Sequence, residues 1–455
     1  MCFPHERHHV MFAVAVDFDV LQEDEFVITF DLCESPLQWF KRVGAVAPEV
    51  LMHRPDNPRR CVEQSLAIGI LADEAEQGTN MRHGLFRFGC REIRFLHGGE
   101  IVARRGSARG SLSRWKSPYG ARMERTSSSP PRAYHRANVI DGPRWIGRDD
   151  GGAPEVARWH QRVCFADLAD AVPPCTQSTA CFIGYASDLG VRMNQGRAGA
   201  ADGPHALRER MSNLPSITGL RLVDCGDIVA SDSVLATQEA LAWAVERIAK
   251  SGALPIILGG GHDQAFGHFL GLARALGHAP ACLNFDAHAD LRPIPASGPN
   301  SGTPFTQASE WCSANGEQFR YAIVGWQDCA NTQLLTTRAK ERGVLSVAAS
   351  EVDRERVKQV TDSFSGLPIA LSIDLDVFAA AYAPGVSAPT ALGIVPDAAF
   401  TVMLRELFAP HGADIRGIEI AELCPALDVD GHTARLGAAL LFTLLSAYAQ
   451  SRSPA

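Results

Sequence analysis

The 455-residue sequence lacks any apolar run that approaches the roughly 18 to 20 residues of a membrane-spanning helix. Its start, MCFPHERHHVMFAVAVDFDV, has acids where the apolar part of a secretory signal would continue. An excess of positive charge is also absent, because 43 Lys and Arg stand against 51 Asp and Glu, for a net charge of -8. That sign is wrong for a protein whose main partner is a nucleic-acid backbone. We expect a cytoplasmic protein that acts on a small molecule and binds neither nucleic acid nor membrane.

The twelve cysteines show no C-x-x-C spacing, and a chain of this length does not need disulfides for stability. We interpret them as reduced thiols, mostly buried, as free cysteine commonly is. The apolar content of 46% is enough to bury a sizeable core. Length and composition together predict one large globular domain with an appendage.

The first third of the chain differs in composition from the rest. Residues 1–103 mix short apolar segments without a regular strand or helix pattern, so we treat them as an N-terminal extension and assign them no fold. Residues 104–142 are rich in Ser, Gly and Pro, and nine basic residues stand against one acid, Glu124, between positions 104 and 136. This composition predicts a flexible linker, with phosphate binding by the basic run as the alternative.

Two interpretations of residues 1–142 remain open. They are either a small fused domain of unknown role or sequence upstream of the true start, with Met123 as an available initiator. We favour the second interpretation, because the segment lacks consistent local patterning. Mass spectrometry of the natural protein distinguishes the two.

From residue 143 to 450, strand and helix patterns alternate as they do in a parallel α/β domain. Asp202 is the expected N-cap of a helix over 202–214, and an amphipathic helix over 430–450 closes the domain. About eight strands with crossover helices indicate a doubly wound sheet. The strand candidates are CFIGYAS, LRLVDCGDI, LPIIL, PACLNF, RYAIVGW, GVLSVAA, LPIALSI and ADIRGIEIA.

Acidic and imidazole side chains directly follow four of these strands. Ligands of parallel α/β sheets bind outside the carboxyl ends of the strands, so the side chains at these ends are expected to meet. In an extended chain, alternate residues face the same side. The acids and the histidine of the motifs DAHAD and DLD stand at every second position, so their side chains are expected to face one side together. The residues at the four strand ends are His262 after PIILGGG, Asp286, His288 and Asp290 after ACLNF, Asp374 and Asp376 after IALSI, and Glu422 after IRGIEIA.

Two histidines and four aspartates form a ligand set suited to Mn2+ and workable for Zn2+, Fe2+ or Co2+, while the lack of thiolates argues against structural zinc. Without cations, four carboxylates at one place repel one another severely. A pair of divalent ions about 3.5 Å apart lowers the pKa of a shared water toward neutrality and presents it to a planar carbon, so hydrolysis is expected. Any one motif is commonly a solvated turn, and a lone His262 a helix cap, but the coincidence of four strands favours a dinuclear site.

The motifs GGGHDQ, NFDAHADLRP, SIDLDVF with the following APGVSAP, and IAELCPALD together resemble those of the ureohydrolase family, which includes arginase, agmatinase and formimidoylglutamase. The resemblance covers about residues 145 to 449. It implies an arginase-like three-layer α-β-α sandwich around an eight-stranded, mostly parallel sheet, and a homo-oligomer, either a trimer or a hexamer. It also implies two Mn2+ ions per subunit, with Glu422 binding the amidine or guanidine group of the substrate. The ligands that it implies are His262, Asp286, His288, Asp290, Asp374 and Asp376.

Within the family, the sequence is most similar to formimidoylglutamase, in the segments DLGVRMNQGRAGAADGPHALR, NSGTPFTQ and WIGRDDGG. Ser301 stands where arginases and agmatinases carry a histidine, just before the glycine that matches Gly302. A guanidine hydrolase protonates an amine leaving group near neutral pH, for which a mobile histidine is useful, so its loss argues against arginase activity. The resemblance implies hydrolysis of N-formimidoyl-L-glutamate to L-glutamate and formamide, a step of histidine degradation. In that reaction Asp290 relays a proton to the departing amine and Glu422 holds the amidinium.

A dicarboxylate substrate needs cationic groups, since planar guanidinium groups match carboxylates bidentately. Arg192, Arg197 and Arg292 are the candidates for this role, and Asn194 and Ser301 are further candidate substrate-binding residues. The alternative for each arginine is a structural ion pair or a solvated position.

Cys424 departs from the pattern of every subgroup, because the family usually has Asn at this place in E-x-N-P, whereas Glu422 is kept.

Two rival functions stay open. One is an agmatinase-like or guanidino-acid ureohydrolase, which urea release from arginine, agmatine or guanidinobutyrate would reveal. The other is a non-catalytic metal-binding subunit, against which the retention of every expected ligand argues.

Overall fold

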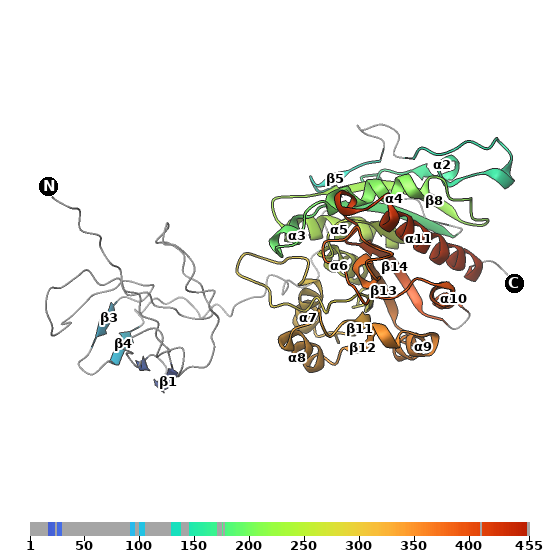
Figure 1. The fold of residues 1–455 in the computed structure, drawn as a ribbon. Coiled ribbons are helices and arrows are strands. Elements are labelled where there is room, and N and C mark those ends of the chain that lie inside the picture. The colour runs from blue at the N-terminus through green and yellow to red at the C-terminus, as the bar shows by residue number, and fades with distance from the viewer. Residues whose placement is uncertain are drawn as a thin grey trace, which may run out of the picture. The chain divides into compact units, whose positions relative to one another are not determined.

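The computed structural model of the protein falls into two compact units, Met1–Trp115 and Lys116–Ala455 (Figure 1). In the first unit, four strands form an antiparallel sheet in the order β1-β2-β4-β3. These strands are β1 (Asp17–Gln22), β2 (Glu25–Thr29), β3 (Glu92–Phe95) and β4 (Glu100–Arg104). The residues that the structure describes are 17–22, 25–29, 92–95, 100–104, 129–137, 145–170, 175, 178–409 and 412–452.

The second unit is built on one sheet in which eight strands run parallel, in the order β12-β11-β10-β13-β14-β9-β7-β8. The prediction of an eight-stranded, mostly parallel sheet is confirmed. Each strand overlaps the segment predicted for it, and the bounds differ by a few residues. The strands are β7 (Thr179–Ala186), β8 (Arg221–Val229), β9 (Leu254–Leu258), β10 (Ala281–Phe285), β11 (Tyr321–Trp326), β12 (Leu345–Ala348), β13 (Pro368–Asp374) and β14 (Asp414–Ala421).

Two short strands that the sequence analysis did not predict extend this sheet beside β8. β5 (Tyr134–His135) pairs with β8 antiparallel, and β6 (Cys164–Phe165) pairs with it in parallel. The Tyr134 hydroxyl donates a hydrogen bond to the Cys225 carbonyl oxygen at 2.9 Å. β5 belongs to the segment 104–142 that was predicted to be a linker, so Tyr134 and His135 of this segment are part of the sheet. Apart from Arg104 in β4 and residues 129–137, that segment lies outside the described residues.

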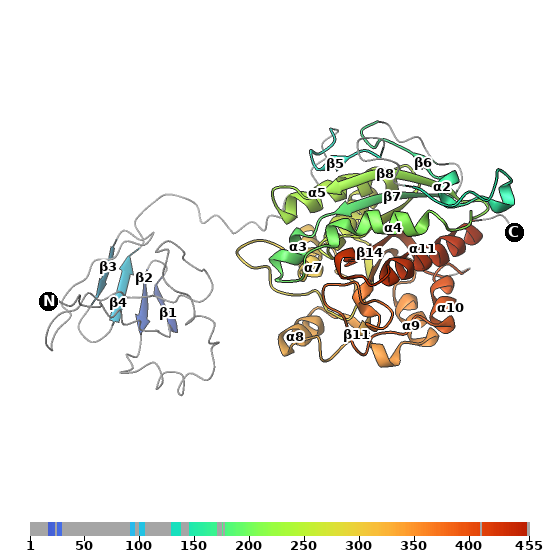
Figure 2. The same cartoon turned by 45° about the horizontal axis from the view of Figure 1, so that its top comes forward.

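Helices cover both faces of the sheet, which gives the three-layer α-β-α sandwich that was predicted (Figure 2). One face carries α4 (Gly203–Met211), α9 (Arg354–Ser363), α10 (Ala398–Glu406) and α11 (His432–Ser451). The other carries α5 (Val234–Lys250), α6 (Gln264–Leu276), α7 (Pro304–Asn315) and α8 (Gln333–Glu341). The shorter helices are α2 (Trp159–Arg162) and α3 (Leu189–Met193), with 3-10 turns at Pro154–Val156, Ala200–Asp202, Ala349–Glu351, Leu375–Val377 and Pro425–Leu427.

Two details of the helices bear on the predictions made from the sequence. Asp202 occupies the expected N-cap position of α4, but its side chain makes no capping hydrogen bond. Among the described residues, none of the helices combines the length and the apolar character that crossing a bilayer demands.

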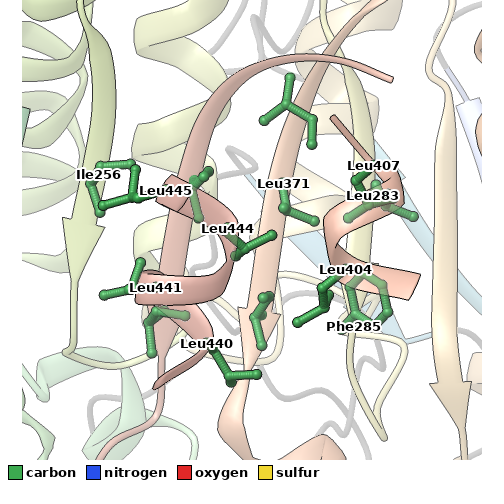
Figure 3. Close-up of a cluster of buried hydrophobic side chains, with 14 of the residues drawn as sticks. Ile256, Leu283, Phe285, Leu371, Leu404, Leu407, Leu440, Leu441, Leu444 and Leu445 are labelled. Atoms are coloured by element: carbon green, nitrogen blue, oxygen red, sulfur yellow. The ribbon is translucent and has the colours of Figure 1, made fainter. Parts of the chain in front are cut away.

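Leucine is the most frequent residue in the core between the sheet and the first helical layer. The leucines of α11 recur at spacings that place them on one face of the helix, because residues three and four apart are neighbours on a helical surface. Full burial of each such side chain contributes about 1.5–3 kcal/mol. Figure 3 shows Leu440, Leu441, Leu444 and Leu445 of α11 in one cluster with Ile256 of β9, Leu371 of β13 and Leu404 of α10.

A buried ion pair joins α4 to the sheet. Arg208 of α4 donates from Nε and Nη2 to the carboxylate of Asp224 at 2.8 and 2.9 Å, and from Nη1 to Asp227 at 2.7 Å. The indole N–H of Trp145 donates to the same Asp224 carboxylate at 2.7 Å. The side chain of Arg208 is 1% exposed and that of Asp224 is fully buried. The attraction between the two charges therefore has to offset the cost of removing each of them from water.

Candidate metal centre

Four adjacent strands bring the predicted ligands together. In the sheet order, β10, β13, β14 and β9 are consecutive neighbours, although they are far apart in the chain. Asp286 directly follows β10, Asp374 ends β13, Glu422 directly follows β14, and His262 lies in the turn between β9 and α6. Since all four strands are parallel, their carboxyl ends form one continuous edge.

A first group of four potential ligands consists of His262 and three aspartates whose carboxylates surround its Nδ1. The nearest carboxylate oxygens are Oδ2 of Asp286 at 3.2 Å, Oδ2 of Asp290 at 2.9 Å and Oδ2 of Asp374 at 3.0 Å. One potential ligand atom from each of the four residues lies within 4.8 Å of the others. A single cation can therefore contact all four.

A second group adjoins the first and consists of Asp286, His288 and Asp376. Nδ1 of His288 lies 3.1 Å from Oδ2 of Asp376 and 3.5 Å from Oδ1 of Asp286. Asp286 is thus common to both groups, with Oδ2 facing His262 and Oδ1 facing His288. The structure gathers all six predicted ligands into two sites that share one carboxylate, which is an arrangement for two cations.

Backbone hydrogen bonds fix the first aspartate of each of the two motifs DAHAD and DLD. Oδ1 of Asp286 accepts a hydrogen bond from the amide of His288 at 2.7 Å, and Oδ1 of Asp374 accepts one from the amide of Asp376 at 2.9 Å. Such bonds from a backbone N–H to an aspartate two residues earlier define a tight turn at the end of each strand. They hold one oxygen of each aspartate and leave the other, Oδ2, toward His262.

Two of the predicted functional residues have a backbone conformation that side chains rarely adopt. The φ angle is +46° at Asp290 and +62° at Glu422, in the left-handed region that favours glycine. Such conformations cost of order 1–3 kcal/mol each and persist where the surroundings impose them, commonly at functional sites. Glu422 is further fixed because its Oε1 accepts a hydrogen bond from the amide of His262 at 2.8 Å.

The donor atoms and their electrostatics fit divalent cations. Nδ1 of His262 and Oδ1 of Asp376 are buried, and neither makes a hydrogen bond to another described residue. Asp376 raises the pKa of His288 to about 12 despite the opposing effect of burial. Burial and the charge of Asp286 raise the pKa of Asp290, and burial raises that of Asp376. The cluster thus takes up protons when it lacks other positive charge, and cations bound to the same nitrogen and oxygen atoms would replace those protons.

Removal of divalent cations is expected to lower the midpoint of thermal unfolding of the full chain, and addition of MnCl2 is expected to restore it. A ligand that binds only the folded state contributes about 2.7 kcal/mol at 100 times its Kd, so each ion adds to stability on this scale. The measurement is calorimetry after dialysis against EDTA and again after reloading. An identical unfolding midpoint for the two samples, with no Mn2+ retained on reloading, would contradict the assignment of a metal site.

The predicted substrate-binding residues separate into two sets. Arg192 forms an ion pair with Asp188 at 2.8 Å. Arg197 donates from Nε to the carbonyl oxygen of Ser387 and from Nη2 to that of Val386, both at 2.8 Å. Both guanidinium groups are thus engaged by the protein itself.

Asn194, Ser301 and Arg292 form the second set and lie next to one another. Nδ2 of Asn194 donates to Oγ of Ser301 at 3.1 Å. Arg292 lies over Gly302, where an added Cβ would come within 2.6 Å of its Cδ and 3.1 Å of Nδ2 of Asn194. The side chain of Arg292 is exposed, and no hydrogen bond or ion pair of its guanidinium appears among the described residues.

The structure also shows supporting residues that the sequence analysis missed. Nδ2 of Asn284 donates to Oδ2 of Asp286 at 2.9 Å, and Oγ of Ser372 lies 2.8 Å from Nε2 of His262. Asn284 and Ser372 precede Asp286 and Asp374 by two residues, so the alternating pattern continues back into each strand and could have indicated them. Cys424 is buried, and its Sγ donates to the carbonyl oxygen of Ala198 at 3.4 Å, so it supports the loop that follows α3.

Comparisons with known proteins agree with this geometry. A model of the arginase family matches residues 178–446. The formimidoylglutamase of Rhodococcus opacus (strain B4) is 40% identical over 318 residues, which are 68% of this chain and 96% of the relative. That of Chromobacterium violaceum is 38% identical over 318 residues, which are 67% of this chain and 98% of the relative.

Solved structures show the same fold. A Trypanosoma cruzi formiminoglutamase with Mn2+ matches with a TM-score of 0.54 and 27% identity, covering 60% of this chain and 94% of that one. An arginase from Bacillus subtilis matches with a TM-score of 0.51 and 28% identity, covering 59% and 98%. The fold and the acid-lined strand edge thus define an α/β protein with a candidate dinuclear metal centre. The chain belongs to the arginase family, and it is a hydrolase that acts on amidino C–N bonds.

Proposed function

We propose that the protein hydrolyses N-formimidoyl-L-glutamate to L-glutamate and formamide, as a step of histidine degradation, and that it uses two Mn2+ ions per subunit. The observation that carries this proposal is the pair of ligand groups sharing Asp286, in a chain 37–40% identical to relatives named formimidoylglutamase. Divalent ions at such a centre would lower the pKa of water and stabilise the negative charge that develops on oxygen in the transition state. The proposal includes a trimeric or hexameric assembly, which sedimentation of the full chain tests.

Glu422 is suited to hold the cationic formimidoyl group. Its side chain is buried at the strand edge, and its Oε1 is already fixed by the amide of His262. Burial and the charge of Asp374 raise the pKa of Glu422, and an amidinium next to the carboxylate favours its charged form. Binding of substrate and ionisation of Glu422 therefore support each other.

Asp290 is suited to move the proton that the reaction requires. Water adds its oxygen to the formimidoyl carbon and loses a proton, the bond from that carbon to the glutamate nitrogen breaks, and this nitrogen must gain a proton to leave. Asp290 belongs to the first ligand group, where a carboxylate can accept the proton that the attacking water loses. Its carboxylate can then return the proton to the departing nitrogen.

Arg292 is the best placed of the three arginines to bind a substrate carboxylate. It follows Asp290 by two residues, and its guanidinium is not engaged by another described side chain. Asn194 and Ser301 lie beside it and offer further polar atoms. Arg197 instead holds the loop after α3 through bonds to backbone carbonyl oxygens. Arg192 pairs with Asp188 at the start of α3.

Replacing Arg292 by alanine is expected to raise KM for formimidoylglutamate roughly 10- to 100-fold with a smaller change in kcat, because a hydrogen bond to a charged group contributes about 1.5–3 kcal/mol. Steady-state kinetics of formamide release measures both constants. Arg354→Ala is the matched control, since this arginine pairs with Glu406 on the surface. An unchanged KM in the Arg292 variant would assign carboxylate binding to other groups.

The proposed function is tested with the Mn2+-loaded full chain and a panel of substrates. We expect formamide from formimidoylglutamate and no urea from arginine, agmatine or guanidinobutyrate. Urea release without formamide would instead show a guanidine hydrolase, the rival within the family. Retention of two ions with turnover of none of these substrates would favour a non-catalytic subunit.

A further inference from the structure

A chain of buried polar side chains lies on the opposite side of the His262 ring from the aspartates. Oγ of Ser372 is 2.8 Å from Nε2 of His262. Oε1 of Glu419 is 3.9 Å from the same nitrogen, and Oε2 of Glu419 is 3.5 Å from Nδ1 of His268 on α6. Ser372 of β13 and Glu419 of β14 are direct neighbours in the register of the sheet, so backbone pairing sets their separation.

Glu419 and His268 have surroundings that are unusual for such polar groups. Glu419 is 0% exposed and His268 is 1% exposed. Both carboxylate oxygens of Glu419 and Nε2 of His268 lack a hydrogen bond among the described residues. Burying a carboxyl group without partners is costly, so its presence calls for a compensating interaction. Within the described part of the chain, the ring nitrogens that lie within 4 Å of these oxygens belong to His262 and His268.

The position of the proton on His262 decides whether it can bind a cation. A neutral imidazole carries one N–H, and the other nitrogen supplies the lone pair that a metal needs. Nδ1 of His262 faces the three aspartates, so the proton must reside on Nε2 for Nδ1 to act as a ligand. Ser372 is placed to accept this N–H, and the Glu419 carboxyl lies on the same side.

We propose that Glu419 and His268 are positioning residues that act through His262. They hold its ring and keep its proton on Nε2, so that Nδ1 remains available to the cation of the first group. Carboxylates that face the far nitrogen of a metal-binding histidine have this effect in general. The inference rests on the metal centre proposed above and adds residues that touch neither the substrate nor the cation.

The proposed effect is confined to one of the two groups. His288, the histidine of the second group, has Asp286 and Asp376 near its Nδ1, and its side chain is 24% exposed. No buried carboxyl group is recorded behind its ring in the described part of the chain. Changes at Glu419 and His268 should therefore weaken cation binding at the first group and spare the second.

The test separates the two groups by removing one histidine at a time. In a His288→Ala background only the first group keeps its full set of side chains, and in a His262→Ala background only the second does. Competition with a fluorescent chelator measures the Kd of Mn2+ for the full chain in each. Glu419→Gln and His268→Gln are expected to raise Kd about 10- to 100-fold in the first background and less than about threefold in the second.

Two further variants support this comparison. Glu246→Gln makes the same chemical change at a buried glutamate of α5 that pairs with Lys250, and it should leave both Kd values unchanged. Gly417→Ala removes no polar group, but its Cβ would lie 2.3 Å from Nε2 of His268 and must displace that ring. It is expected to act selectively on the first group, even if the Glu419 variant fails to fold.

The possible outcomes are distinct. Equal losses of affinity in both backgrounds would show a general loss of packing and overturn the positioning role, as would unchanged affinity in both. If the unaltered chain bound no Mn2+, the metal centre and this inference would both be overturned. A selective loss in the His288→Ala background supports the positioning role and depends on no measurement of turnover.

Discussion

Replacing Asp286 by alanine is expected to remove both cations and lower kcat/KM for formimidoylglutamate by roughly 10^3-fold or more. Asp286 contributes one oxygen to each ligand group, so its loss damages both at once. Metal ions at the proposed centre would supply several kcal/mol of charge stabilisation in the transition state, and each 1.36 kcal/mol corresponds to a tenfold change in rate. Kinetics and metal analysis after dialysis measure the two effects.

The matched control for this variant is Asp232→Ala, which changes an exposed aspartate in the turn before α5 and should keep both ions and full activity. An Asp286→Ala protein that retained two tightly bound ions would contradict the shared-carboxylate arrangement. One that lost its ions but kept its turnover would contradict a metal-dependent reaction.

Replacing Arg208 by methionine is expected to lower the free energy of unfolding by about 3–5 kcal/mol, because removal of one partner of a buried ion pair leaves an uncompensated charge. The carboxylate that loses its buried cation is that of Asp224, which is fully buried. Equilibrium unfolding in urea, monitored by intrinsic fluorescence and by circular dichroism, measures the change. Trp145 donates to Asp224, so its fluorescence reports on the same network.

Arg354→Met is the control for this loss of stability. Its ion pair with Glu406 is on the surface, where such pairs contribute about 0–1 kcal/mol. Equal destabilisation by the two substitutions would show that burial of the Arg208 pair carries no special cost. A variant of Arg208 as stable as the unaltered chain would show that Asp224 finds another partner.

The parallel sheet could be predicted because its signals are local. Each of the eight strands is a short apolar run bounded by turn residues, and the ligands follow the strands at alternating positions. The order β10-β13-β14-β9, which brings the ligands together, depends on pairing between distant segments and leaves no local trace. β5 and β6 are two residues long each and show no periodicity, so they could not be recognised.

Side-chain partners were harder to predict than ligands. Arg197 contacts carbonyl oxygens about 190 positions away in the chain, and nothing in its sequence neighbourhood indicates them. Glu419 and His268 resemble ordinary residues of a strand and a helix, and only the register of β14 with β13 places Glu419 beside Ser372. The candidate metal ligands were easier to group from the sequence because their chemistry and spacing are both distinctive.

The backbone bonds at the two aspartate turns also limit which acids can serve there. Asp286 and Asp374 each offer one oxygen to an amide two residues on and the other to the His262 side of the centre. A glutamate carries one more methylene, so it cannot close the same small ring while its second oxygen stays in place. Exchange of Asp for Glu at these positions keeps the charge but breaks the turn. In comparisons among related sequences, the two acids should therefore be scored as different residues at both positions.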